Sequence, residues 1–174
     1  MEELKDILKK LQAPLGLDEI EFMPKTAVSN NTLALILAYK DARCDMKRLD
    51  EATGGLWQNK YERDSKGVLQ CGIGIKVSSE WVWKWSNGVP SANEKEKGEY
   101  SDAFKRAGFM WGIGRELYEY PVIFADLNEH DFDKSGKLRI YPKNWEWRVV
   151  EGVLWAKDEK GNKRVRLEMP TQSE

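Results

Sequence analysis

Apolar positions recur at helical spacing in three stretches of the chain. In the first stretch, Leu4, Ile7, Leu8 and Leu11 fall on one face, which is the pattern of a helix that packs on a core. The second stretch ends at a pair of glycines, and the third is the longest. The three predicted helices cover residues 2–11, 41–52 and 94–118.

Strands are predicted mainly between the second and third helices, where short stretches alternate with turn residues such as Gly67 and Gly88. Three strands at this spacing predict an antiparallel meander. Its predicted strands cover residues 57–63, 68–77 and 80–85. Elsewhere, extended or strand structure is predicted over residues 19–28, 32–39, 138–141 and 145–155.

These elements predict an α+β fold, with an antiparallel β-meander packed on the long third helix. The 174 residues suit one domain with a sizeable core. We expect that core over about residues 32–121, preceded by the N-terminal helix. Strands over about residues 138–156 and a polar tail from Glu168 follow it.

Tryptophan is abundant, with eight in the chain, and Trp81, Trp83 and Trp85 alternate along one predicted strand. Their side chains therefore share one face. That face is predicted to pack on the long helix or on a neighbouring sheet, because soluble monomers avoid large exposed apolar patches. A surface that stacks nucleic-acid bases and a subunit interface are the alternatives. Trp145 and Trp147 repeat the pattern and receive the same interpretation.

The composition of the chain predicts where the protein is located in the cell, but it says less about the function of the protein. The N-terminus has no leader pattern, and no apolar run is long enough to span a membrane. We therefore expect a cytoplasmic protein without a membrane partner. Cys44 and Cys71 are predicted to be buried free thiols. The net charge is −1, yet residues 39–115 hold 14 Lys and Arg against 11 Asp and Glu. This mildly basic middle permits a nucleic-acid groove.

No constellation of catalytic or metal-binding residues is recognisable in the sequence. His130 is the only histidine, and no loop with the Walker lysine pattern is present. The acidic loop Asp131–Gly136 resembles the start of a calcium-binding loop, but its twelfth position is Pro142 instead of Glu. We interpret it as a polar turn. The expectation is a protein that is not an enzyme and binds no cofactor.

Basic residues gather on two of the predicted helices. Arg43 and Lys47 lie one turn apart on the second helix, and Lys105 and Arg106 are adjacent on the third. A solvated helix surface and a groove that holds phosphates both account for such residues.

Two segments then carry a family resemblance. The first contains YKDAR at residues 39–43, LDEA at 49–52 and GLW at 55–57; the second contains GEYSDAFKRA at 98–107 and WGIGRELY at 111–118. Together they resemble the Rad fifty-two family of single-strand annealing proteins. The likeness is greatest to its small phage members of the Sak type and to DNA-damage-response relatives.

The resemblance implies a β-β-β-α core that assembles into rings or helical filaments and holds single-stranded DNA in a basic groove. Such a protein anneals complementary strands without ATP during recombination and repair. The resemblance assigns DNA contacts to Arg43, Lys105, Arg106 and Tyr39, and more loosely to Lys97. Lys47 joins them by its position on the helix of Arg43. A phage origin would place the protein in a bacterial host cell.

Other functions stay open at this point. A binding module could protect DNA ends without annealing them, a metal-dependent nuclease could use the same groove, and a scaffold could form rings without touching DNA. A single-strand-binding protein or an exonuclease is open as a further partner.

Overall fold

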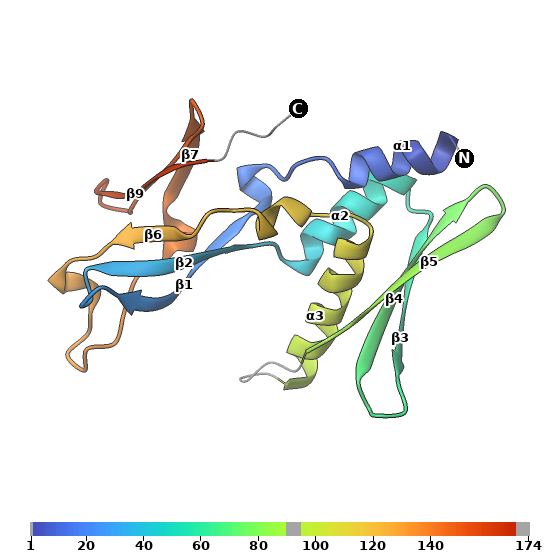
Figure 1. The fold of residues 1–174 in the computed structure, drawn as a ribbon, viewed down its shortest axis with the longest axis horizontal. Helices are drawn as coiled ribbons and strands as arrows, with labels where there is room; N and C mark the ends of the chain where they lie inside the picture. Colours follow the sequence, from blue (N-terminus) through green and yellow to red (C-terminus); the bar gives the residue numbers. More distant parts are fainter. Residues whose placement is uncertain (1, 90–94, 170–174) are drawn as a thin grey trace. The chain divides into compact units, whose positions relative to one another are not determined.

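The computed structural model describes residues 2–89 and 95–169. The chain forms two compact units, each built from two segments of the sequence (Figure 1). The first unit contains Met1–Leu15 and Lys40–Arg115, and the second contains Gly16–Tyr39 and Glu116–Glu174. The prediction that residues 1–174 act as one DNA-annealing domain stays a prediction.

The fold is α+β, as predicted. In the first unit the meander β3–β4–β5 is antiparallel throughout and packs on the long helix α3, which confirms the predicted architecture. The helices of this unit are α1 Glu2–Leu11, α2 Ala42–Thr53 and α3 Lys95–Met110. Its strands are β3 Trp57–Arg63, β4 Leu69–Val77 and β5 Glu80–Asn87.

One face of the meander builds the core of the first unit. Strand β4 buries every second side chain, and these pack against apolar residues of α3 that recur at helical spacing. Side chains of α1 and α2 complete the same cluster. Its fully buried members include Leu69, Cys71, Ile73 and Ile75 from β4, Ala103, Phe104, Ala107 and Trp111 from α3 and its C-terminal turn, and Leu11 and Leu49 from α1 and α2.

Helix α3 is shorter than predicted. The helix was expected to run to Tyr118, but it ends at Met110 and is followed by turns and a short 3-10 helix, Arg115–Tyr118. Gly112 and Gly114 cause the break, because both have positive φ angles, 101° and 71°. The guanidinium of Arg115 then donates to the carbonyls of Phe109 and Met110 at the helix end. The predicted start at Glu94 lies outside the described residues.

The second unit contains two antiparallel sheets, β1–β2–β6 and β7–β8–β9. The predicted strand over residues 32–39 is confirmed as β2, and it pairs with both neighbours in its sheet. Pro24 lies in the edge strand β1, where the register shifts just beyond it, as expected for proline in a strand. The strands are β1 Glu21–Val28, β2 Leu33–Tyr39, β6 Ile123–Asp126, β7 Glu146–Val150, β8 Val153–Lys157 and β9 Lys163–Glu168.

Two strand predictions in this unit need correction. Residues 138–141 form no strand; Leu138 makes only an isolated bridge to Phe132, and a 3-10 turn begins at Pro142. No strand is predicted between residue 156 and the polar tail that starts at Glu168, yet residues 163–168 form β9, whose four charged side chains hide the strand pattern in the sequence. Residues 170–174 of that tail lie outside the described residues. The strand structure predicted over residues 145–155 is confirmed as β7 and β8, which pair with each other.

Within the described ranges, no helix combines the length and the apolar character that crossing a membrane requires.

Candidate nucleic-acid interface

Helix α2 presents two of the predicted contact residues to solvent. Asp41 caps its N-terminus by accepting hydrogen bonds from the backbone N–H groups of Arg43 and Cys44, at 2.7 and 3.1 Å. The side chain of Arg43 is 92% exposed, with Nε 3.8 Å from the Asp41 carboxylate. Lys47 follows one turn later and is also exposed, with Nζ 4.0 Å from Glu51. Both ion pairs are at the surface and therefore weak. The fold thus does not depend on either cation, and both are accessible to a ligand.

A buried ion pair lies beside this surface. The ammonium of Lys40 donates to both carboxylate oxygens of Asp45, at 2.5 and 2.6 Å, and both side chains are buried. Helix α3 approaches closely here, because a Cβ on Gly108 would lie 2.1 Å from Asp45 Oδ1. Burial raises the pKa of Asp45 to about 6, against the opposing effect of the Lys40 charge. No local pattern in the sequence predicts that Lys40 is paired and buried.

Lys105 links the two helices electrostatically. It lies on α3, half-buried, and its positive charge acts on the carboxylate of Asp45 across the α2–α3 contact. This places Lys105 next to the helix that carries Arg43 and Lys47. Arg106 is more exposed, at 46%, and its Nε donates to Asp102 at 2.8 Å. Because adjacent helical residues are about 100° apart, Lys105 and Arg106 leave α3 in different directions.

The remaining residues of the segment Gly98–Ala107 have structural contacts. Glu99 is buried and accepts two hydrogen bonds from the guanidinium of Arg63 on β3, at 3.3 and 2.9 Å. Tyr100 packs edge-on against Tyr61 of β3. Asp102 also accepts from the backbone N–H of Val89. Ala103, Phe104 and Ala107 belong to the core. Much of the motif thus specifies how α3 packs, and Lys105 and Arg106 are the cations that it adds to the surface.

Two predicted contact residues are placed differently. Tyr39 ends β2 in the second unit, and its hydroxyl donates to Glu21 of β1 at 2.5 Å. Lys97 lies in the first turn of α3, but its side chain is outside the described part of the chain. The structure therefore brings Arg43, Lys47, Lys105 and Arg106 onto two packed helices of one unit.

The three tryptophans of β5 lie on the face of the meander that is turned away from α3. In the antiparallel register, Trp85 pairs with Gly72, Trp83 with Gly74 and Trp81 with Lys76. The core-facing residues of β4 are the intervening ones, such as Ile73 and Ile75. The prediction that these tryptophans pack on the long helix is wrong. Successive residues of a strand point to opposite faces of the sheet, and the tryptophans are paired with the residues of β4 that point away from α3. We call Trp81, Trp83, Trp85, Gly72 and Gly74 the tryptophan face.

Trp145 and Trp147 pack within the second unit, as predicted. Trp147 stacks on Phe22 with ring centroids 3.6 Å apart and an interplanar angle of 11°. Trp147 also donates through Nε1 to the carbonyl of Pro142 at 2.8 Å. Trp145 is buried, and its ring centroid lies 5.2 Å from the Arg164 guanidinium carbon.

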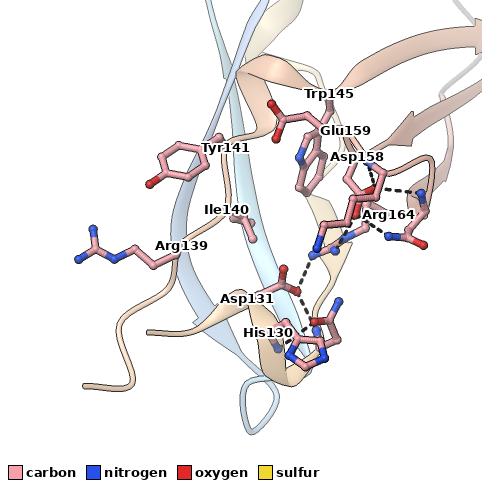
Figure 2. Close-up of a pocket in the computed structure, with 12 residues that line it drawn as sticks. His130, Asp131, Arg139, Ile140, Tyr141, Trp145, Asp158, Glu159 and Arg164 are labelled. Carbon is pink, nitrogen blue, oxygen red and sulfur yellow. Dashed lines mark hydrogen bonds and ion pairs between the residues drawn. The ribbon is translucent and has the colours of Figure 1, made fainter. Parts of the chain in front are cut away.

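The second unit also contains a pocket of about 310 Å³, shown in Figure 2. Arg164 is one of the residues that line the pocket. Its guanidinium donates hydrogen bonds to Asp131 at 2.5 Å and to Asp158 at 3.1 Å. Two carboxylates thus neutralise this buried cation, and the contacts tie β9 to the segment that precedes the Phe132–Leu138 bridge. The loop Asp131–Gly136 is a polar turn, as interpreted, in which Asp133 accepts from the backbone N–H groups of Ser135 and Lys137.

Among the described residues, no group of three or more His, Cys, Asp or Glu side chains gathers as a metal site would require. Cys44 and Cys71 are free thiols and buried, as predicted, and burial raises the pKa of Cys71 to about 12.

Comparison with known proteins adds two relatives. One, from Deinococcus radiodurans, is named single-stranded DNA-binding protein DdrA and is 32% identical over 131 residues. The chain is similar to DdrA. The DdrA protein of Deinococcus deserti is likewise 32% identical, over 134 residues. Each match covers 73% of this chain but only 62% and 64% of the respective DdrA protein. No family model and no solved structure matches the chain.

Proposed function

We propose that this protein binds single-stranded DNA and anneals complementary strands without ATP, in DNA recombination and repair. The observation that carries the proposal is how the residues of the segment Gly98–Ala107 on α3 are used in the structure. Most of its residues enter the core or pair with other elements, while Lys105 and Arg106 remain at the surface beside a helix that exposes Arg43 and Lys47. The name of both DdrA relatives supports the choice of ligand.

The chemistry suits annealing because no covalent bond is made or broken. Two DNA backbones repel each other, and the cations Arg43, Lys105 and Arg106 reduce that repulsion by neutralising phosphates. Contacts of these cations to the backbone leave the base edges free to pair. Lys47 and Lys97 are proposed as further DNA contacts in the first unit, and Tyr39 is proposed as a DNA contact in the second unit.

Assembly into rings or filaments is part of the proposal and rests on the resemblance to the Rad fifty-two family. An oligomer would join many weak phosphate sites into one long site and so raise the affinity for a strand. Net charge favours such an assembly, since a chain with a charge of −1 carries little repulsion between copies.

A second candidate is a module that coats and protects single strands without annealing them. The names of the DdrA relatives favour this candidate, because they mention the binding of single-stranded DNA and do not mention annealing. The two candidates differ in whether the bound strand pairs faster than free DNA.

An annealing assay separates them. Two complementary oligonucleotides with fluorescent labels are mixed without ATP or metal, with the wild-type protein or with the variant Arg43→Ala, Lys105→Ala, Arg106→Ala. We expect the wild type to accelerate pairing at least about tenfold, and the variant to lose most of that acceleration, because about three phosphate contacts per protomer are removed.

The matched control is the variant Lys5→Ala, Lys9→Ala, Lys10→Ala. It removes the same charge from exposed positions of α1 in the same unit, and it should anneal as the wild type does. Wild-type protein that binds DNA without accelerating pairing would favour the protective module. Acceleration that survives the triple change would contradict the assignment of Arg43, Lys105 and Arg106.

A further inference from the structure

The tryptophan face has the geometry of a surface on which flat rings stack. Three ring atoms of Trp85 lie 2.5, 2.6 and 2.7 Å from the position that a Cβ on Gly72 would occupy. For Trp83 and Gly74 the corresponding distances are 2.7, 2.8 and 2.9 Å. Distances this similar mean that each indole lies flat on the sheet. One ring face therefore covers the glycine backbone, and the other is turned away from the sheet.

Glycine at these two positions is a requirement of this arrangement. Any larger residue at 72 or 74 would place its Cβ 2.5–2.9 Å from ring atoms, closer than van der Waals contact allows, so the indole would have to move off the sheet. The three rings form a row, since the centroids of Trp81 and Trp83 are 6.3 Å apart and those of Trp83 and Trp85 are 5.9 Å apart. Trp81 at one end of the row is 40% exposed, and the other two are half-buried.

The spacing of the rings selects for a single strand. Bases stacked in a duplex cover one another's faces at a separation of about 3.4 Å, whereas the rings of the tryptophan face lie side by side along the sheet, with centroids 6.3 and 5.9 Å apart. Bases that lie on neighbouring rings must therefore be separated from one another, which a flexible single strand permits and a duplex does not. Aromatic side chains on an open sheet that each stack one base are an established form of single-strand recognition.

Charge on the same face favours a nucleic acid over a second copy of this chain. Lys60 of β3 is exposed and its Nζ lies 4.8 Å from the ring centroid of Trp83, at the middle of the row. Lys76 lies opposite Trp81, and Glu62 is the carboxylate on this face of β3. The centres of protein interfaces are depleted in lysine, because burying an ammonium is costly. Beside a DNA strand the same lysine can contact a phosphate.

The geometry points to the tryptophan face as a base-stacking surface that holds up to three bases of a single DNA strand, with Lys60 and Lys76 on its phosphates. This inference deepens the proposed function and rests on it for the identity of the ligand. The face lies across the meander from α3, so it is distinct from the cations of α2 and α3 and reads a different part of the nucleotide, the base plane.

The test compares two oligonucleotides of equal length and charge, one of thymidines and one of abasic sites. Fluorescence anisotropy gives the affinity of each for the full chain, and the ratio of the two affinities isolates the contribution of the bases. Each stacked base is expected to strengthen binding roughly 5- to 150-fold. We therefore expect wild type to prefer the thymidine strand by at least about tenfold.

Two matched variants identify the rings. Trp83→Leu with Trp85→Leu keeps apolar cover over the glycines but removes the flat rings, and it should reduce the preference towards one. Trp83→Phe with Trp85→Phe keeps aromatic faces and should retain most of it. Affinity for the abasic strand should be unchanged in both, which also reports that they fold. Should the leucine pair fail to fold, Trp81→Leu at the exposed end of the row replaces it and should lower the preference.

The possible failures are distinguishable. Wild type that binds both oligonucleotides equally, or leucine variants that keep the preference, would overturn the stacking surface and leave the proposed DNA binding intact. Leucine variants with unchanged preference but a lower oligomeric mass by light scattering would assign the face to contacts between copies instead. Wild type that binds neither oligonucleotide would overturn the proposed function as well.

Discussion

Asp45 combines complete burial with a charged partner. Its carboxylate is held by Lys40 from the strand–helix junction, and Gly108 leaves the space that it occupies. Burial disfavours the charged form, so the pKa of Asp45 rises from 3.8 to about 6. In the unfolded chain the same group titrates near its ordinary value. Between about pH 4 and pH 6, the folded protein therefore binds a proton here more readily than the unfolded chain does.

This difference predicts a pH dependence of stability. Because the folded state binds the additional proton, the free energy of unfolding contributed by Asp45 decreases as the pH rises from about 4 to about 6. The variant Lys40→Met, Asp45→Leu should lack this decrease, since it removes the pair without leaving one buried charge alone. Urea unfolding across this pH range, followed by tryptophan fluorescence, measures it. Identical pH profiles for wild type and variant would contradict the assignment.

Single residues were predictable from the sequence where local spacing decides their environment. The exposure of Arg43 and Lys47 follows from their positions on an amphipathic helix, and the burial of both cysteines follows from residue type. Lys40 was not predictable as a buried residue. Its partner Asp45 lies nearby on α2, but the space that the pair occupies depends on Gly108 of α3, more than sixty residues later in the chain.

At the scale of elements, the packing of the indoles on β4 makes a stability prediction. Gly74→Ala would place a methyl group 2.7 Å from the Trp83 ring, which must then move off the sheet. We expect a loss of about 1–3 kcal/mol in the free energy of unfolding, as is usual for overpacking. Urea unfolding measures it, and a change in near-ultraviolet circular dichroism should report the displaced ring.

Gln70→Ala is the matched control for this change. Gln70 lies on the same face of the same strand, but its partner on β5 is Asn87, which carries no ring. This variant should be close to wild type in stability. Equal stability of the two variants would mean that Trp83 accommodates the methyl group and that Gly74 is not required by the ring.

The elements of the first unit were predictable because each follows from its own sequence. The spacing of apolar and turn residues that predicts α1, α2 and the three meander strands lies within each segment itself. The predicted end of α3 at Tyr118 is wrong because Gly112 and Gly114 adopt positive φ angles, which a helical spacing of apolar residues does not reveal. The side of the meander on which α3 packs was also missed, since alternation groups residues by face without saying which face is inward.

At the scale of the whole molecule, the sequence did not reveal that each compact unit is assembled from two separate segments. Strand β2 directly precedes α2, yet it belongs to the sheet of the second unit. Such pairing between distant segments depends on long-range contacts, which local patterns do not encode. Both groups of residues proposed to contact DNA, the cations of α2 and α3 and the tryptophan face, lie in the first unit.

The central claim is that cations on α2 and α3 bind the phosphates of single-stranded DNA, and the salt dependence of binding tests it most directly. The logarithm of the affinity for a thymidine oligonucleotide should fall linearly with the logarithm of salt concentration, with a slope of about −0.7 per phosphate contact. In the variant Arg43→Ala, Lys105→Ala, Arg106→Ala the slope should be shallower by about 2 per protomer. The variant Lys5→Ala, Lys9→Ala, Lys10→Ala should keep the wild-type slope. Equal slopes and affinities for all three proteins, or no binding by the wild type, would contradict the account.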